Sequence, residues 1–129
     1  MNHLAVIAAA LSDLLVGAIW YSPPLFARAW RREAGLSEES LRKGNPGLVY
    51  TAAFLLALVI SYVLGSFLDD PRTDALWGFT VGFLAGIWAA AAFIIVALFE
   101  RRRPAYFLIH VGYILAAFTL KGLIIGAWR

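Results

Sequence analysis

The sequence contains no cysteine among its 129 residues. Disulfide bonds, thiolate metal sites and cysteine nucleophiles are therefore excluded. Charged residues are scarce as well, at 15% of the chain, against about 25% in ordinary soluble domains. Hydrophobic residues make up 62%, and the mean hydropathy is +0.78. So short a chain cannot bury this much apolar surface in water, and a lipid bilayer is the solvent that removes the conflict.

The sequence also lacks the common signatures of catalytic and cofactor sites. It has no glycine-rich phosphate loop, no nucleophile elbow and no pair of acids at catalytic spacing. No second histidine, cysteine or carboxylate stands at a spacing from His110 that would make a metal site. We therefore expect a non-enzymatic protein with no metal and no cofactor.

Four long apolar runs are present, at residues 4–21, 48–68, 75–99 and 105–128. Each is long enough for a helix rising about 1.5 Å per residue to cross about 30 Å of hydrocarbon. Helices are favoured because the bilayer core offers no water to backbone amides. The sequence thus predicts an all-α membrane protein in which residues 1–129 form one bundle of four transmembrane helices.

Prolines and polar residues separate the runs. Pro23 and Pro24 end the first helix, and Asn45-Pro46-Gly47 is expected to form a turn ahead of the second. Pro104 fits the first position of the fourth helix, where its missing N–H is not needed. A signal peptide is a poor alternative for the first run, because no basic residue precedes it and Asp13 interrupts it.

Basic residues gather in two of the three connections. The first holds Arg28, Arg31, Arg32, Arg42 and Lys43, and the third holds Arg101, Arg102 and Arg103. Short loops rich in lysine and arginine stay on the cytoplasmic side. We therefore expect both loops in the cytoplasm, both termini outside, and the chain in a bacterial inner membrane. The arginines are expected to favour anionic lipid over nucleic acid.

The first connection has room for short helices. Within residues 25–32, apolar side chains share one helical face and the arginines lie largely off it, a pattern typical of an interfacial helix. A solvated loop in which Trp30 dips into the headgroups is the alternative. Ser37 and Gly44 fit the two ends of a second short helix. Trp20, Tyr21 and Tyr106 are expected to anchor the spans at the cytoplasmic interface.

Gly78, Gly82 and Gly86 recur every four residues in the third run. Small residues at this spacing let two helices approach closely in a membrane. We expect a helix contact along this row, made either within the chain or with a second copy in a homo-oligomer. Gly122 and Gly126 repeat the spacing once in the fourth run.

Asp13 lies near the middle of the first run, where a carboxylate costs roughly 2.5 to 3.5 kcal/mol on insertion scales. The fourth run places His110, Tyr113 and Lys121 on one helical face, and Lys121 lies at a depth similar to that of Asp13. The two residues either form an ion pair that serves packing, or Lys121 snorkels outward and leaves Asp13 free to titrate.

The chain resembles a known family along nearly its whole length. The matching residues are Asn2, Gly17-Ala18-Ile19-Trp20-Tyr21-Ser22-Pro23, Phe26, Trp30 and Gly35-Leu36-Ser37 early on, and Leu98-Phe99-Glu100, Pro104, Gly112-Tyr113 and Gly126-Ala127-Trp128 later. On these residues it resembles bacterial members of domain-of-unknown-function family 1761. That pattern often has asparagine in place of His110 and histidine in place of Ile114.

The resemblance implies a four-helix membrane protein and supplies no activity. It directs attention to the Trp20-Tyr21 segment and to Glu100. Glu100 is expected to pair with Arg28, Arg31 or Arg32, because both loops lie on the cytoplasmic face. Two functions fit the sequence: a small transporter or channel that uses the Asp13 carboxylate, and a non-transporting scaffold that binds lipid or a partner.

Overall fold

The computed structural model describes the backbone of residues 1–129 and every side chain except those of Glu38 and Arg42. Arg42, one of the basic residues counted above, therefore lies outside the described side chains. Within this description the chain is helical and has no strand. The helices are α1 (His3–Trp20), α2 (Ala27–Ala34), α3 (Glu38–Lys43), α4 (Pro46–Phe67), α5 (Ala75–Phe99) and α6 (Pro104–Ala127).

Four of the described helices, α1, α4, α5 and α6, are long and apolar enough to cross a membrane. The predicted runs are confirmed, with ends that move by at most two residues. Asn45-Pro46-Gly47 is not a separate turn, because α4 begins at Pro46. The Asn45 side chain accepts a hydrogen bond from the Leu48 N–H, and proline is favoured in a first helical turn.

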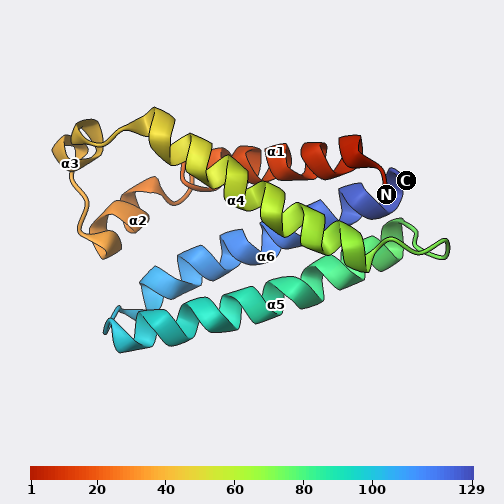
Figure 1. Cartoon of the computed structure of the whole chain (residues 1–129). Coiled ribbons are helices and arrows are strands. Elements are labelled where there is room, and N and C mark those ends of the chain that lie inside the picture. The colour runs from red at the N-terminus through yellow and green to blue at the C-terminus, as the bar shows by residue number, and fades with distance from the viewer.

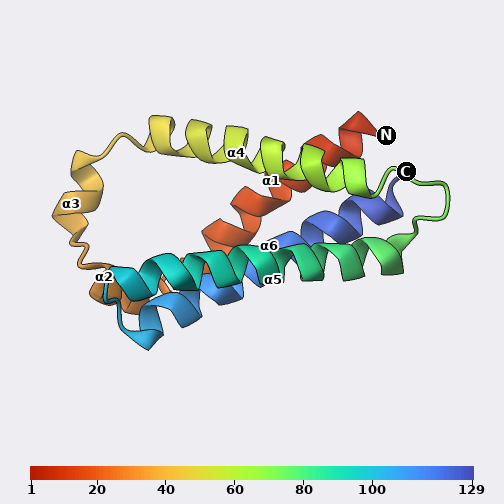
Figure 2. The same cartoon turned by 60° about the horizontal axis from the view of Figure 1, so that its bottom comes forward.

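The long helices pack unevenly. Helices α5 and α6 lie side by side along their length, while α1 packs against both α6 and α4 (Figures 1 and 2). The buried residues of α4, Ala57, Ser61, Leu64 and Gly65, all lie toward its end, whereas Leu48 near its start is 66% exposed. Helix α4 therefore diverges from the bundle near its first turns.

Glycines form the contact between α5 and α6. The row of Gly78, Gly82 and Gly86 is buried, and it meets Phe118 and Gly122 of α6. A Cβ atom built on Gly82 would lie 2.5 Å from the Phe118 carbonyl oxygen, and one on Gly78 would collide with the Gly122 carbonyl. The predicted close contact is confirmed, and its partner is a helix of the same chain.

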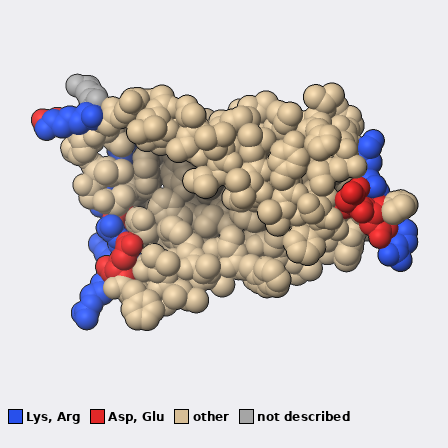
Figure 3. Space-filling model, in the orientation of Figure 1, with Lys and Arg blue, Asp and Glu red and all other residues tan. Residues whose placement is uncertain are grey.

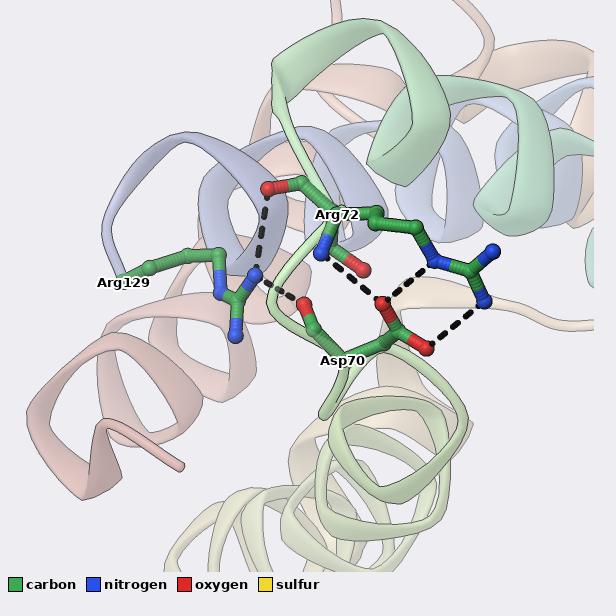
Figure 4. Close-up of polar contacts among 4 residues, drawn as sticks. Asp70, Arg72 and Arg129 are labelled. Atoms are coloured by element: carbon green, nitrogen blue, oxygen red, sulfur yellow. Dashed lines mark hydrogen bonds and ion pairs between the residues drawn. The ribbon is translucent and has the colours of Figure 1, made fainter.

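We call the end of the bundle that holds both termini and the 68–74 loop the termini end. The N-terminal ammonium lies 3.3 Å from the Asp69 carboxylate. Arg129 donates hydrogen bonds to the carbonyls of Asp70 and Thr73, which fastens the C-terminus to the loop (Figure 4). Hydrogen bonds from the Arg72 side chain and backbone lower the pKa of Asp70 to about 2, so this carboxylate stays charged well into the acid range.

We call the opposite end, formed by α2, α3 and the 100–103 loop, the basic end. Helix α2 packs against α6, and its C-terminus is capped by Gly35, whose φ of 71° is left-handed. A helix is present where one was predicted in residues 25–32, but it begins and ends two residues later, at Ala27 and Ala34. Ser37 caps α3 as predicted. On the face drawn in Figure 3, lysines, arginines and acids gather at the two ends, and the band between them shows none.

Candidate intramembrane charge site

Asp13 of α1 and Lys121 of α6 meet inside the bundle. The Lys121 Nζ lies 3.0 Å from the Asp13 Oδ1, and the two side chains are 1% and 14% exposed. The Lys121 ammonium also lies 4.6 Å from the centre of the Phe118 ring. Of the two arrangements that the sequence allowed, the structure has the ion pair, and Lys121 does not snorkel outward.

Helix periodicity brings the pair together. Leu4, Leu11 and Leu15 point outward from α1, and Asp13 lies away from this exposed stripe. On α6, Ala117 is 1% exposed and sits one turn before Lys121, so both face the protein interior. Depth and periodicity predicted the matching height, but only the packing of α1 on α6 places the two charges in contact.

Tyr113 shares the same carboxylate oxygen. Its hydroxyl donates to the Asp13 Oδ1 over 2.9 Å, so this oxygen accepts from both an ammonium and a phenol. Gly17, one turn after Asp13, leaves room for the tyrosine ring: a Cβ there would lie 3.7 Å from the ring. The arrangement holds the Asp13 carboxylate in one orientation between two donors.

A second polar contact lies beside the first. The Tyr21 hydroxyl and His110 Nδ1 are 2.5 Å apart, and the Tyr21 ring lies 5.5 Å from the Tyr113 ring. Lys121, Asp13, Tyr113, Tyr21 and His110 therefore form a run of polar side chains, which we call the polar chain.

Trp20 and Tyr21, which the sequence predicted to anchor the first span at the interface, both contact α6. The Trp20 indole N–H donates to the Ile109 carbonyl over 2.9 Å, and its ring lies over Gly112, where a Cβ atom would collide with it. Tyr21 turns inward to His110. Helix α6 thus offers a carbonyl, a glycine and a histidine to the two aromatic side chains.

The charges of the basic end pair differently from the prediction. The Glu100 carboxylate lies 3.4 Å from the Arg102 Nε in its own loop. The link between the loops is made instead by Glu33 of α2, whose Oε2 lies 4.0 Å from the Arg103 Nε. Glu100 directly follows α5 at a tight turn, which keeps its short side chain local.

The aromatic residues around His110 form a compact group. Tyr106 and Phe93 have ring centres 4.6 and 5.2 Å from the histidine ring, and Trp30 of α2 lies 5.1 Å from Tyr21. Trp30 thus lies in a helix and contacts another part of the protein, and it is not part of a solvated loop. Among the described side chains, no group of three or more histidines, cysteines or acids is placed to hold a metal ion.

Sequence reasoning found four members of the polar chain and missed the place of Tyr21 among them. Tyr21 was assigned to the interface because it directly precedes Ser22 and two prolines at the end of an apolar run. Its pairing with His110 depends on a contact between residues 89 positions apart. One signal was present: the two segments that carry the family resemblance, around Trp20 and around Gly112, are the segments that meet.

Comparison with known proteins gives the family and no activity. No curated protein and no solved structure matches the chain significantly. The family described as protein of unknown function (DUF1761) matches residues 4–126, almost the whole chain and all four long helices. This chain is therefore a member of the DUF1761 family of proteins of unknown function.

Proposed function

We propose that this protein is a small, non-enzymatic membrane transporter in which a cation competes with Lys121 for the Asp13 carboxylate. The observation that carries the proposal is the buried pair itself, with its Nζ to Oδ1 distance of 3.0 Å. Replacing a buried ion pair by well-packed apolar residues is often neutral or stabilising, so stability alone does not explain why two charges are kept here. Ionisable residues inside a membrane usually mark an ion or substrate pathway.

The charges of the pair set the stoichiometry of the exchange. The ion pair is neutral when Asp13 is ionised and Lys121 protonated. A monovalent cation that binds the carboxylate leaves the Lys121 ammonium without its counter-charge, in surroundings where only 1% of its side chain is exposed. An isolated ammonium in an apolar interior is costly and gives up its proton. One cation enters, one proton leaves, and the net charge of the site is unchanged.

A route for the cation is suggested by two features. The polar chain leads from Asp13 through Tyr113 to Tyr21 and His110, near the basic end. On the same half of the molecule, a hollow opens between α4 and the paired helices α5 and α6 (Figure 3). Polar groups beside a hollow are the features that let an ion leave water before it reaches a buried charge.

The second candidate function is a scaffold, and one observation favours it. Asp13 already has Lys121 and Tyr113 as partners, so it is not the unpaired carboxylate that a simple proton carrier needs. In this alternative the pair only fixes how α1 packs on α6, and the protein acts by binding lipid or another membrane protein.

Proton release separates the two functions. The purified protein in weakly buffered detergent is mixed with Na⁺, K⁺ or tetraphenylphosphonium, and a pH-sensitive dye reports released protons. We expect about one proton per bound cation, because the site keeps its net charge, and none from Asp13→Asn, which lacks the carboxylate. Lys43→Met is the control, since the Lys43 side chain is 76% exposed and should not affect release. Absence of release with all three cations would favour the scaffold.

We propose further that the basic end faces the cytoplasm, where its arginines contact anionic headgroups. The support is the count of basic residues in the loops and the exposure of Arg28, Arg101 and Arg103. Single cysteines at Glu39 and Arg72, whose side chains are 79% and 91% exposed, lie at opposite ends of a chain that has no cysteine of its own. In intact cells, an impermeant maleimide is expected to label position 72 and not position 39. The reverse pattern would invert the topology.

A further inference from the structure

A groove between α4 and α5 opens sideways from the bundle. Its outer part is a cavity of 470 Å³ lined by Leu64 and Phe67 of α4 and by Trp77, Val81 and Trp88 of α5, among others. An adjoining cavity of 340 Å³ shares Leu64, Phe67 and Trp88 and is equally apolar. We call these two cavities the α4–α5 groove. It lies between two helices that are apolar enough to span a membrane, where the neighbouring molecules are acyl chains.

The groove ends at a polar mouth. Phe67 and Trp77 also line a third cavity, of 530 Å³, whose other walls are Asp70, Arg72, Thr73 and Asp74 of the 68–74 loop. Thr73 is only 7% exposed, and its Oγ1 has no hydrogen-bond partner among the described groups. Because buried hydroxyls are normally hydrogen-bonded, this oxygen is a hydrogen-bonding group that the described residues leave unused beside the mouth.

Charge at the mouth decides which polar group fits. Charges of both signs are present at the termini end, where Asp69, Asp70 and Asp74 lie with Arg72, Arg129 and the N-terminal ammonium. Arg72 uses Nε and Nη2 on Asp70, which leaves Nη1 outside those bonds, and Asp74 uses Oδ1 to cap α5. The Arg72 Nη1 and the second carboxylate oxygen of Asp74 therefore remain for a ligand in the cavity that Thr73 also lines. That combination complements a headgroup that carries both a phosphate and an ammonium.

We propose that the α4–α5 groove binds one zwitterionic phospholipid, with an acyl chain in the groove and the headgroup at the mouth. The Thr73 hydroxyl and Arg72 hold the phosphate, and Asp74 faces the ammonium. An amphipathic molecule fits the sequence of cavities, polar at the loop and apolar below it. This site is separate from the Asp13–Lys121 pair and does not rest on the proposed exchange.

Native mass spectrometry of the full-length protein in detergent tests the site. Phosphatidylethanolamine and phosphatidylglycerol with identical acyl chains are titrated in turn. We expect one phosphatidylethanolamine to bind more tightly than phosphatidylglycerol. Thr73→Val should weaken its binding about tenfold by removing a hydrogen bond to a charged group, and Thr73→Ser should restore it.

A larger side chain in the groove tests whether an acyl chain occupies it. Ala89 lines it, so Ala89→Phe should displace the acyl chain and also weaken phosphatidylethanolamine binding about tenfold. Ala91→Phe, on an exposed part of the same helix, should leave binding unchanged. Phosphatidylglycerol that binds at the basic end should not respond to Ala89→Phe. Equal affinity for the two lipids, or unchanged binding in both Thr73→Val and Ala89→Phe, would overturn the proposal.

Discussion

Asp13→Asn is expected to destabilise the protein by about 3–5 kcal/mol, because it leaves the buried Lys121 ammonium without its counter-charge. Lys121→Met is expected to cost less. The carboxylate it leaves behind keeps the hydrogen bond from Tyr113 and can take up a proton, whereas an asparagine supplies no charge to the ammonium. Unfolding of the purified protein in detergent, followed by tryptophan fluorescence, measures both changes.

The double variant isolates the interaction between the two charges. When both are removed, neither partner is left buried alone, so the double variant should be more stable than Asp13→Asn by about 2 kcal/mol or more. Effects that simply add would show that the 3.0 Å contact contributes no coupling. A strong coupling supports the ion pair on which both proposed functions depend, and proton release then decides between them.

An exposed pair of the same chemistry serves as the control. Glu39 and Lys43 are four residues apart on α3, and the Lys43 Nζ lies 3.3 Å from the Glu39 Oε1. Their side chains are 76% exposed for Lys43 and 79% exposed for Glu39. Glu39→Gln with Lys43→Met should show a coupling of only about 0.3–0.5 kcal/mol, because water screens the charges and competes for them. Added salt should weaken this surface coupling further and leave the coupling of Asp13 with Lys121 nearly unchanged.

The sequence predicted those parts of the fold that depend on local chemistry. Hydrophobic length alone located the spans, and Ser37 and Pro104 stand at helix starts because their side chains suit those positions in any helix. Four-residue spacing predicted the row at Gly82 in the same way. Periodicity does not identify the neighbouring helix. Only the structure shows that the glycine row packs against α6.

In the candidate site, too, the sequence predicted what local chemistry determines and missed what depends on packing. Asp13 and Lys121 were found because a charge in an apolar run is costly wherever the run packs. The partners of Tyr21 and Glu100 were not predicted, because both residues lie where a span meets its loop, and there the sequence does not tell which neighbour a side chain turns to. Tyr21 turns to His110, and Glu100 stays with Arg102.

Gly82→Ala is expected to destabilise the protein by about 2–3 kcal/mol, and Gly82→Leu by more. The added Cβ would lie 2.5 Å from the Phe118 carbonyl oxygen, which belongs to the backbone of α6 and cannot move without the helix. Close approach of α5 and α6 would be lost along the whole row, and with it the packing that replaces the hydrophobic effect inside a membrane. Unfolding in detergent again provides the measurement.

Gly17→Ala is the matched control, because it makes the same substitution in another spanning helix with the opposite expected sign. Its Cβ would lie 3.7 Å from the Tyr113 ring, an ordinary van der Waals contact. Alanine is favoured over glycine in a helix by about 1 kcal/mol, so this variant should be as stable as the original protein or slightly more stable. Similar losses at both positions would mean that the cost comes from glycine removal in general, and the tight contact of α5 with α6 would then not be the cause.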